Sequence, residues 1–154
     1  MRTIEDLLGD VPALAALSPE HRATLAGCAR NHVYAAGEYI FKEGDPATTF
    51  HAIREGAVAL ETFAPQRGPI TIETLHDGDL LGWSWLLAPY RVAFDARALD
   101  TTHVMAFDGV CLRGKFDTDP ALGYDLLRLF AAVIVDRLQQ TRLRLLDVYG
   151  KDGG

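Results

Sequence analysis

The stretch that decides the fold is Ala36–Ala47, which reads AGEYIFKEGDPA. Its centre, Tyr39–Phe41, is a short run of β-forming residues that ends at a turn containing glycine and proline. The pattern recurs along the middle of the chain, where glycine-containing turns are spaced roughly 8–12 residues apart. Short strands closed by such turns predict an antiparallel roll or barrel. The further runs lie at Phe50–Ile53, Val58–Phe63, Ile70–Leu75, Phe94–Leu99 and Val104–Phe107.

Helical patterns flank this region on both sides. Ser18–Pro19 forms a helix start, because serine caps free backbone N–H groups and proline suits the first helical position. We expect that helix to end near Asn31. At the other end, Asp119–Pro120 predicts the start of a helix that continues to about Val148 with an apolar stripe at helical spacing. This stripe must cover the roll, a second chain or both.

Composition excludes several classes of protein. The 154 residues are 49% hydrophobic and 23% charged, as in one ordinary globular domain, so a disordered or collagen-like chain is excluded. No apolar run approaches the roughly 18 residues of a membrane helix, and the acidic N-terminus is unlike a signal peptide. A net charge of −6 without a basic run argues against DNA binding. The cluster Arg137, Arg142 and Arg144 lies among acids and is expected on a solvated helix face.

The residue patterns of enzymes and metal sites do not stand out. The five histidines are scattered without the His-x-His spacing of a metal site, and there is no nucleophile motif or phosphate-binding glycine loop. Cys28 and Cys111 lie far apart in the sequence and are expected to be reduced thiols of a cytoplasmic protein. Glu61 and Glu73 are expected to face solvent from their strands. We therefore expect no catalytic residue, no metal and no enzymatic activity.

Three segments together resemble one family. Ala36–Ala47 is similar to the first signature of cyclic nucleotide-binding domains, and Phe50–Val58 to the aromatic, aliphatic and glycine positions that follow it. Leu75–Gly82 resembles the strand and turn that enter the nucleotide cassette of that family. Glycines stand at the family's turn positions, where positive φ is often needed. These are Gly37, Gly44, Gly56, Gly78 and Gly82.

The resemblance covers roughly residues 10–148 and implies an α+β fold. Its centre is an antiparallel jelly-roll-like β-roll, also called a double-stranded β-helix, with N-terminal helices and a long C-terminal helix. We expect one domain over residues 1–149, with the roll at about 32–108, the C-terminal helix at about 120–148 and a disordered tail over 150–154. In the catabolite activator branch a helix-turn-helix DNA-binding domain would follow. We expect a stand-alone sensor without it.

The resemblance places a ligand pocket along Gly82–Phe94, but both of its anchors differ here. In the family, a glutamate after the cassette glycine binds the ribose, and an arginine further on pairs with the cyclic phosphate. Trp83 and Val92 occupy these positions. Arg91 is one residue off and would reach inward only if the strand bulged, while Arg97 is expected to face outward. A cyclic nucleotide (cAMP or cGMP) is therefore not expected to bind tightly.

The candidate ligand-binding residues belong to the cassette and the segment after it: Gly82, Trp83, Ser84, Trp85, Arg91, Val92, Ala93 and Phe94. Free N–H groups at the start of a short helix near Ser84 would offer only a weak anion site. The aromatic residues allow two interpretations. They line a pocket for another flat or apolar ligand, or they fill the vacated pocket and extend the core. The two tryptophans cannot point the same way on a short helix, so we expect one in the core and the other either at the rim or facing a partner.

The sequence leads to two hypotheses of function. The first is a regulatory module with an altered pocket that acts through a separate, unidentified partner protein. The alternative is a ligand-free docking subunit. In both, a homodimer is expected through the C-terminal helix, because its apolar residues exceed what one contact face needs. Leu122, Leu126, Phe130, Val133 and Ile134 are expected to pack on the roll, which leaves Leu127, Leu138, Leu143, Leu145 and Leu146 uncovered.

Overall fold

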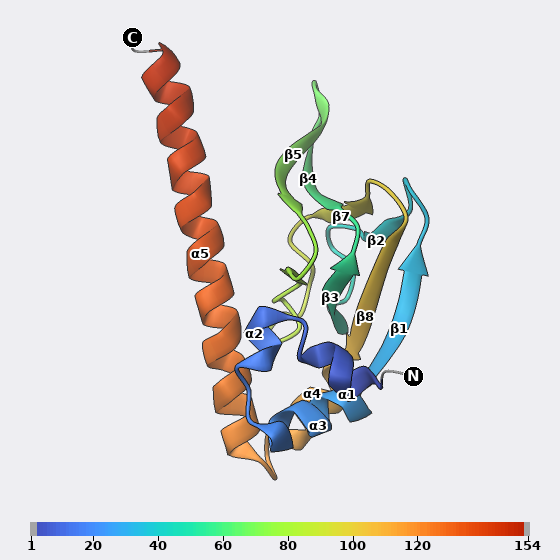
Figure 1. Ribbon diagram of the computed structural model, residues 1–154. Helices are drawn as coiled ribbons and strands as arrows, with labels where there is room; N and C mark the ends of the chain where they lie inside the picture. The colour runs from blue at the N-terminus through green and yellow to red at the C-terminus, as the bar shows by residue number, and fades with distance from the viewer. Residues whose placement is uncertain (1–2, 153–154) are drawn as a thin grey trace.

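The computed structural model describes residues 3–152, with side chains described through residue 147 (Figure 1). Three short helices, α1 (Ile4–Leu8), α2 (Pro12–Ala15) and α3 (Pro19–Gly27), precede the strands, and α4 (Gly109–Lys115) and α5 (Pro120–Asp152) follow them. Figure 1 shows helices α1 to α4 gathered at one end of the strands, with α5 running along their side. Within residues 3–152, every helix falls short of the length or hydrophobicity that a membrane span requires.

The strands form two four-stranded antiparallel sheets, which confirms the predicted α+β roll. In one sheet the order is β1 (Ala29–Tyr34), β8 (Thr102–Asp108), β3 (Thr49–Glu55) and β6 (Leu80–Leu81). In the other the order is β2 (Tyr39–Phe41), β7 (Asp95–Ala98), β4 (Val58–Ala64) and β5 (Gly68–Leu75). The chain passes from one sheet to the other at most connections, so each sheet is completed only when the whole middle region has folded.

The turn glycines expected from the sequence all have positive φ. Gly56 shows why the residue type matters at the turn between β3 and β4. Its φ is +132°, and a Cβ atom there would lie 2.6 Å from Thr102 Oγ1 and 2.8 Å from Thr102 Cα. Only glycine combines this backbone conformation with so close an approach.

Several boundaries differ from the expectation. Helix α3 ends at Gly27, short of Asn31, because β1 begins at Ala29 and pairs with β8 along its whole length. The short helix expected near Ser84 is replaced by turns, with one hydrogen bond of 3.1 Å from Leu86 N to Trp83 O. Helix α5 continues to Asp152, into the stretch expected to be a tail. Residues 153 and 154 lie outside the described part.

The larger part of the core lies between the helices and the sheet that contains β3. Four aromatic rings meet there: Phe50 stacks on Phe107 and Trp85 at centroid distances of 4.4 and 5.0 Å, and Phe130 meets Phe50 edge-on at 5.0 Å. The smaller part lies inside the roll and includes Ile53, Leu81 and Phe94. The first half of α5 therefore belongs to the core. Its fully or almost fully buried residues are Leu122, Leu126 and Phe130.

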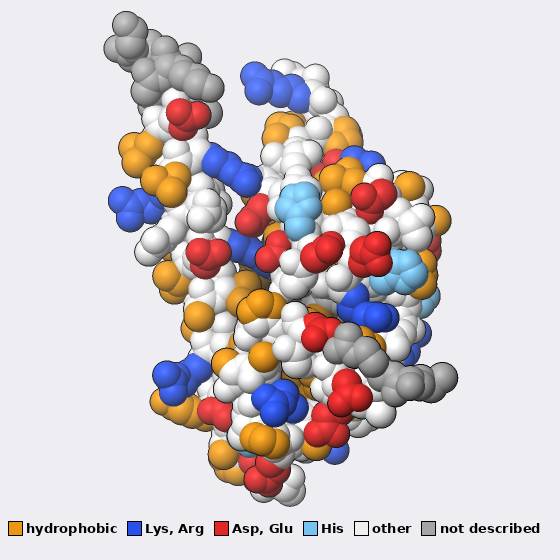
Figure 2. All heavy atoms as spheres, viewed as in Figure 1, with side chains coloured by type: hydrophobic (Ala, Val, Ile, Leu, Met, Phe, Trp, Pro, Cys, Tyr) orange, Lys and Arg blue, Asp and Glu red, His pale blue; other side chains and the backbone are white. Residues whose placement is uncertain are grey.

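The second half of α5 stands beside the β4–β5 hairpin rather than against it. Figure 2 shows basic side chains between the two and hydrophobic side chains on the outer side of the helix. As expected, the apolar residues beyond the packed stripe are exposed: Leu127, Leu138, Leu143, Leu145 and Leu146. The helix is thus packed at its base and open to solvent along its far half.

Glu61 is buried, contrary to the expectation that it faces solvent. Arg97 donates from Nε and Nη2 to its two carboxylate oxygens, each at 3.0 Å. On β7, Arg97 is paired with Ala59, two residues from Glu61 on the same face of β4. Diagonal neighbours on adjacent strands lie within reach of long side chains, so the guanidinium covers the carboxylate.

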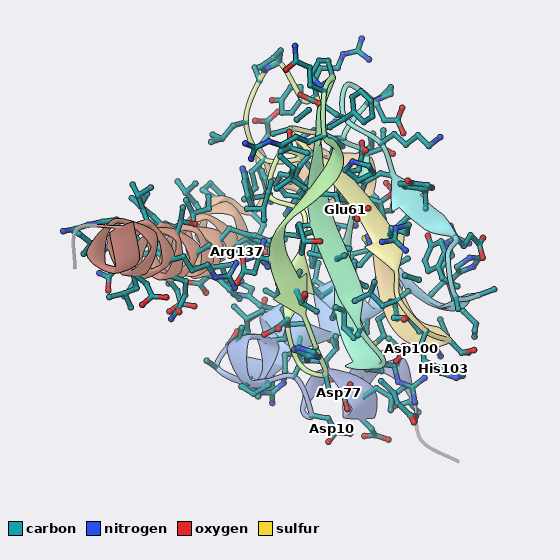
Figure 3. All side chains as sticks on the ribbon, turned by 90° about the horizontal axis from the view of Figure 1, so that it is seen from above. Asp10, Glu61, Asp77, Asp100, His103 and Arg137 are labelled. Atoms are coloured by element: carbon teal, nitrogen blue, oxygen red, sulfur yellow. The ribbon has the colours of Figure 1, made fainter. Side chains whose placement is uncertain are left out.

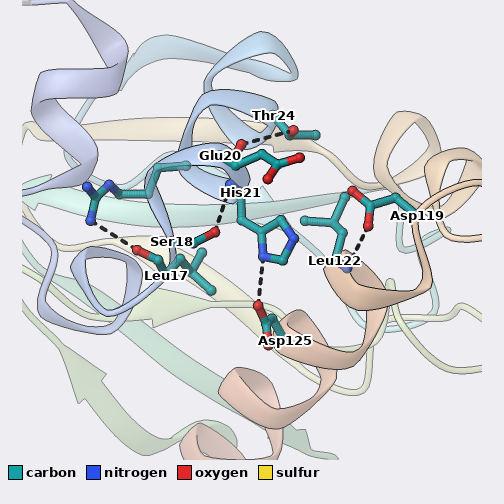
Figure 4. Close-up of polar contacts among 9 residues, drawn as sticks. Leu17, Ser18, Glu20, His21, Thr24, Asp119, Leu122 and Asp125 are labelled. Carbon is teal, nitrogen blue, oxygen red and sulfur yellow. Dashed lines mark hydrogen bonds and ion pairs between the residues drawn. The ribbon is translucent and has the colours of Figure 1, made fainter.

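The helix starts use the predicted caps, and an ion pair joins two of the helices (Figure 4). The Ser18 side chain accepts a hydrogen bond of 3.2 Å from His21 N, and Asp119 Oδ1 accepts one of 3.2 Å from Leu122 N. Between these caps, His21 Nδ1 lies 2.7 Å from Asp125 Oδ2. The base of α5 is thereby fastened to α3.

His51 makes the stability of the roll sensitive to acid. It lies on β3, is 4% exposed, and has its ring 6.1 Å from that of Tyr34. Burial, and to a lesser extent the charges of His32 and Arg30, together lower its pKa to about 4. The folded protein thus keeps His51 neutral at pH values where the unfolded chain, with a pKa near 6.5, is protonated. The free energy of unfolding should therefore decrease as the pH falls from about 6.5 towards 4.

We predict that His51→Gln reduces this acid-induced loss by about 1–3 kcal/mol, measured by urea unfolding at pH values of about 7 and 5. His76→Gln is the matched control because His76 is exposed, and it should retain the wild-type decline. An unchanged decline in His51→Gln would show that another group carries the acid sensitivity.

Candidate ligand site between the roll and helix α5

The eight candidate residues lie on the connection between β6 and β7, and the last four of them, residues 91–94, alternate in exposure. Val92 and Phe94 are each 8% exposed and face the core, while Arg91 and Ala93 are exposed. Gly82, with φ +92°, turns the chain out of β6, and Ser84 is half-buried in the turns that follow. The segment thus places apolar side chains inward, as the parity of its sequence predicts.

Backbone pairing keeps Arg91 on the outside. Gly44 N donates to Val92 O at 2.8 Å, and Val92 N donates to Asp45 O at 2.9 Å. This pairing fixes Val92 inward without a bulge at Arg91, whose Nη1 reaches back to Gly44 O at 3.4 Å. Arg97 is engaged with Glu61, so both arginines of this segment have partners within the fold.

The two tryptophans point apart, as expected, although they stand on turns rather than on a helix. Trp85 is fully buried in the core beside Phe50. Trp83 is half-buried and meets Phe94 edge-on, with centroids 5.1 Å apart, while Phe94 in turn lies 6.0 Å from Phe41. Of the candidate residues, Trp83 and Phe94 are therefore brought together, and Trp85 belongs to the core.

Arg137 of α5 joins Trp83 and Phe94 in one cluster of side chains. The sequence did not identify Arg137 as a candidate site residue. It was expected on a solvated face, but only 8% of it is exposed. Its guanidinium lies over the Trp83 ring, 5.4 Å from the centroid, and donates to the carbonyl oxygen of Leu80. Figure 3 shows Arg137 at the side of α5 that faces β5. The signal was in the spacing, because position 137 continues the buried stripe of Phe130 and Val133 at i+7 and i+4.

Carboxylates surround the Arg137 guanidinium. Burial lowers its pKa, and the charges of Glu73, Asp79 and Asp136 oppose that shift. Arg137 Nε lies 3.8 Å from Glu73 Oε2. Glu73, expected to face solvent, is half-buried because α5 lies over it. One guanidinium nitrogen, Nη1, is buried without a hydrogen-bond partner among the described residues. The cation thus joins α5 to the roll and is balanced by acids already present.

Five of the cavities lined by described residues have volumes of about 300 to 520 Å³, and none of these five is lined by a candidate residue. The one nearest the cluster, about 300 Å³, is lined by Arg137 together with Glu73, Asp79 and Asp136. Within residues 3–152, no group of three His, Cys, Asp or Glu side chains is placed to hold a metal ion.

Comparison with known proteins gives consistent matches. Residues 31–119 match the family model of the cyclic nucleotide-binding domain. The chain is 42% identical over 55 residues to a cAMP-dependent protein kinase regulatory subunit from Emericella nidulans, covering 36% of this chain and 13% of the relative. It is 34% identical over 100 residues to Electron transport regulator A of Shewanella oneidensis, covering 64% of this chain and 39% of that relative. The chain therefore spans well under half of the length of either relative.

Among solved structures, a candidate cyclic nucleotide-binding protein from Geobacter metallireducens GS-15 has a TM-score of 0.78 and 28% identity. The alignment covers 90% of this chain and 99% of that chain, so it includes the helices at both ends as well as the roll.

We predict that Arg137→Ala lowers the free energy of unfolding by about 2–4 kcal/mol, because it removes a buried cation and leaves Glu73 partly buried without its partner. The emission of Trp83 should shift to longer wavelength as its covered face becomes exposed. Arg142→Ala is the matched control, since Arg142 is exposed on the same helix, and it should change stability by less than about 0.5 kcal/mol. Equal effects of the two substitutions would contradict the role assigned to Arg137.

Proposed function

The chain belongs to the family of cyclic nucleotide-binding domains, and we propose that it is a regulatory module with an altered nucleotide site, acting through a separate partner protein. The observation that supports this best is the cluster of Trp83, Phe94 and Arg137 at the cassette. In the family, the nucleotide binds at that place. We place the protein in the cytoplasm in this proposal. We expect this domain neither to bind DNA nor to catalyse a reaction.

Charge at the cassette disfavours a cyclic phosphate. A buried phosphate needs a paired cation, and Val92 supplies none. The Arg137 guanidinium lies over Trp83, but its charge is already balanced by the carboxylates of Glu73, Asp79 and Asp136. A bound anion would have to compete with these acids for one cation. The aromatic side chains, in contrast, occupy the site without any such cost.

We predict that cAMP and cGMP at tens of micromolar leave the thermal unfolding temperature unchanged, because both family anchors are absent. A ligand present at a hundred times its Kd would add about 2.7 kcal/mol of stability, which a thermal-shift measurement resolves. Adenosine and 5′-AMP serve as matched compounds that separate binding of the flat base from binding of a phosphate.

A saturable shift with a cyclic nucleotide would contradict the altered site. Arg91→Ala and Arg97→Ala would then identify the phosphate partner, since only the substitution at the true partner should abolish the shift. A shift with adenosine alone would favour an aromatic pocket for a flat, uncharged ligand.

We further propose that the module is a homodimer through α5. The supporting observation is the row of exposed leucines, from Leu127 at 50% to Leu146 at 61% exposure, on a helix whose base is fully packed. Burying one exposed leucine contributes about 1.5–3 kcal/mol, so a paired row can outweigh the cost of association. A second copy related by a two-fold axis presents the same row and covers it. The same surface serves the alternative function, a docking subunit without a ligand.

Light scattering at micromolar concentration should give twice the mass of one chain. Leu138→Asp should reduce it to the mass of one chain, because it places a charge in the middle of the row. Gln139→Asp adds the same charge at the neighbouring, exposed polar position and should leave the dimer intact. A wild-type monomer in this measurement would remove the dimer from the proposal.

A further inference from the structure

Cys28 and Cys111 stand 83 positions apart in the sequence but meet in the fold. Their Sγ atoms are 2.8 Å apart. Cys28 is the half-buried residue that ends α3, and Cys111 is an exposed residue in the first turn of α4. Both line a cavity of about 520 Å³ beside β1 and β8. The two cysteines, which lie far apart in the sequence, are therefore a pair of neighbouring thiols that reagents can reach.

Asp108 holds the two cysteines together with one hydrogen bond from its backbone and one to its side chain. Asp108 N donates to Cys28 O at 2.8 Å, and Asp108 Oδ1 accepts from Cys111 N at 2.9 Å. Asp108 is also the last residue of β8, which pairs with β1 immediately after Cys28. Sheet pairing and the Asp108 cap of α4 thus hold the backbone of both cysteines in place.

A covalent bond between the sulfurs suits this geometry better than a shared metal ion. Within residues 3–152, no group of three potential His, Cys, Asp or Glu ligands is assembled. Disulfide sulfurs lie about 2.05 Å apart, so closure needs a movement of less than about 1 Å. We propose that Cys28 and Cys111 form a modification site, in which a peroxide reversibly converts the dithiol to an intramolecular disulfide.

The exposure of the two residues sets the order of the steps. The Cys111 thiolate attacks one peroxide oxygen, which gives a sulfenic acid and releases hydroxide. The Cys28 thiolate then displaces hydroxide from that sulfenic sulfur and forms the S–S bond. In sum, two thiols and one hydrogen peroxide give one disulfide and two waters, and the two electrons pass from the sulfurs to the peroxide.

The environment of Cys28 favours its role as the second nucleophile. In the reduced pair its pKa is raised to about 12, first by burial and then by the hydrogen bond and charge of Cys111 and the charge of Asp108, while Lys115 lowers it. Oxidation of Cys111 removes the hydrogen bond and charge of its thiol, which lowers the pKa of Cys28, while the effects of burial, Asp108 and Lys115 remain. Cys28 is thus the less reactive thiol before the first step and a better nucleophile after it.

The disulfide would join the end of α3 to the start of α4, which Figure 1 shows close together at the base of α5. It would therefore hold the N-terminal helices to the segment that leads into the long helix. This inference does not depend on whether the cassette binds a nucleotide.

The test uses the purified full-length chain treated with a small excess of hydrogen peroxide. Both thiols should become inaccessible to alkylation, the mass should fall by about 2 Da, and digestion should yield the Cys28 peptide linked to the Cys111 peptide. Dithiothreitol should restore both thiols. The thermal unfolding temperature should rise on oxidation and return on reduction, because the cross-link limits the unfolded chain.

Single serine variants supply the control. Cys28→Ser should not lose mass; Cys111 should instead proceed to the sulfinic acid, a gain of about 32 Da. Cys111→Ser should react more slowly, because the remaining thiol is half-buried. The proposal is overturned if the wild-type chain gains the same mass while Cys28 still reacts with the alkylating reagent, or if disulfides form only between chains.

Discussion

Phe50 is the contact on which the rest of the structure depends. Its ring stacks on Phe107 and Trp85 and meets Phe130 edge-on, so a single side chain of β3 touches β8, the β6–β7 connection and α5. Aromatic contacts of this kind combine large buried area with a preferred geometry. The cluster fixes where α5 leaves the roll, and this direction places Arg137 over Trp83.

The parts of the fold predicted from the sequence are those with local causes. Turn glycines with positive φ and the caps at Ser18 and Asp119 depend on residues only a few positions apart, so the pattern identified them. Helix α4 and β6 are short enough that no periodicity distinguishes them, and they were missed. Helix α3 was predicted too long because β1 pairs with β8, a strand that lies far along the chain and that no local propensity reports.

In the candidate site, too, the features with local causes were predicted and those that depend on distant residues were not. The alternation of residues in the segment after Gly82 was enough to predict that Val92 points inward and Arg91 outward. Arg137, Glu61 and the meeting of Cys28 with Cys111 each depend on a partner from another element, and a charged residue on a helix is ordinarily read as exposed. The spacing of Arg137 within the buried stripe is the one signal that outweighs its charge.

The fastening of α5 has a consequence for how this chain tolerates mutation. Both Arg137 and Arg144 donate to main-chain carbonyl oxygens, those of Leu80 and Ile72. A carbonyl oxygen is present whatever amino acid stands at a position, so sequence drift at Leu80 or Ile72 leaves these acceptors in place. These two hydrogen bonds are therefore lost by substitution of Arg137 or Arg144, whereas substitution of Leu80 or Ile72 leaves both acceptors in place.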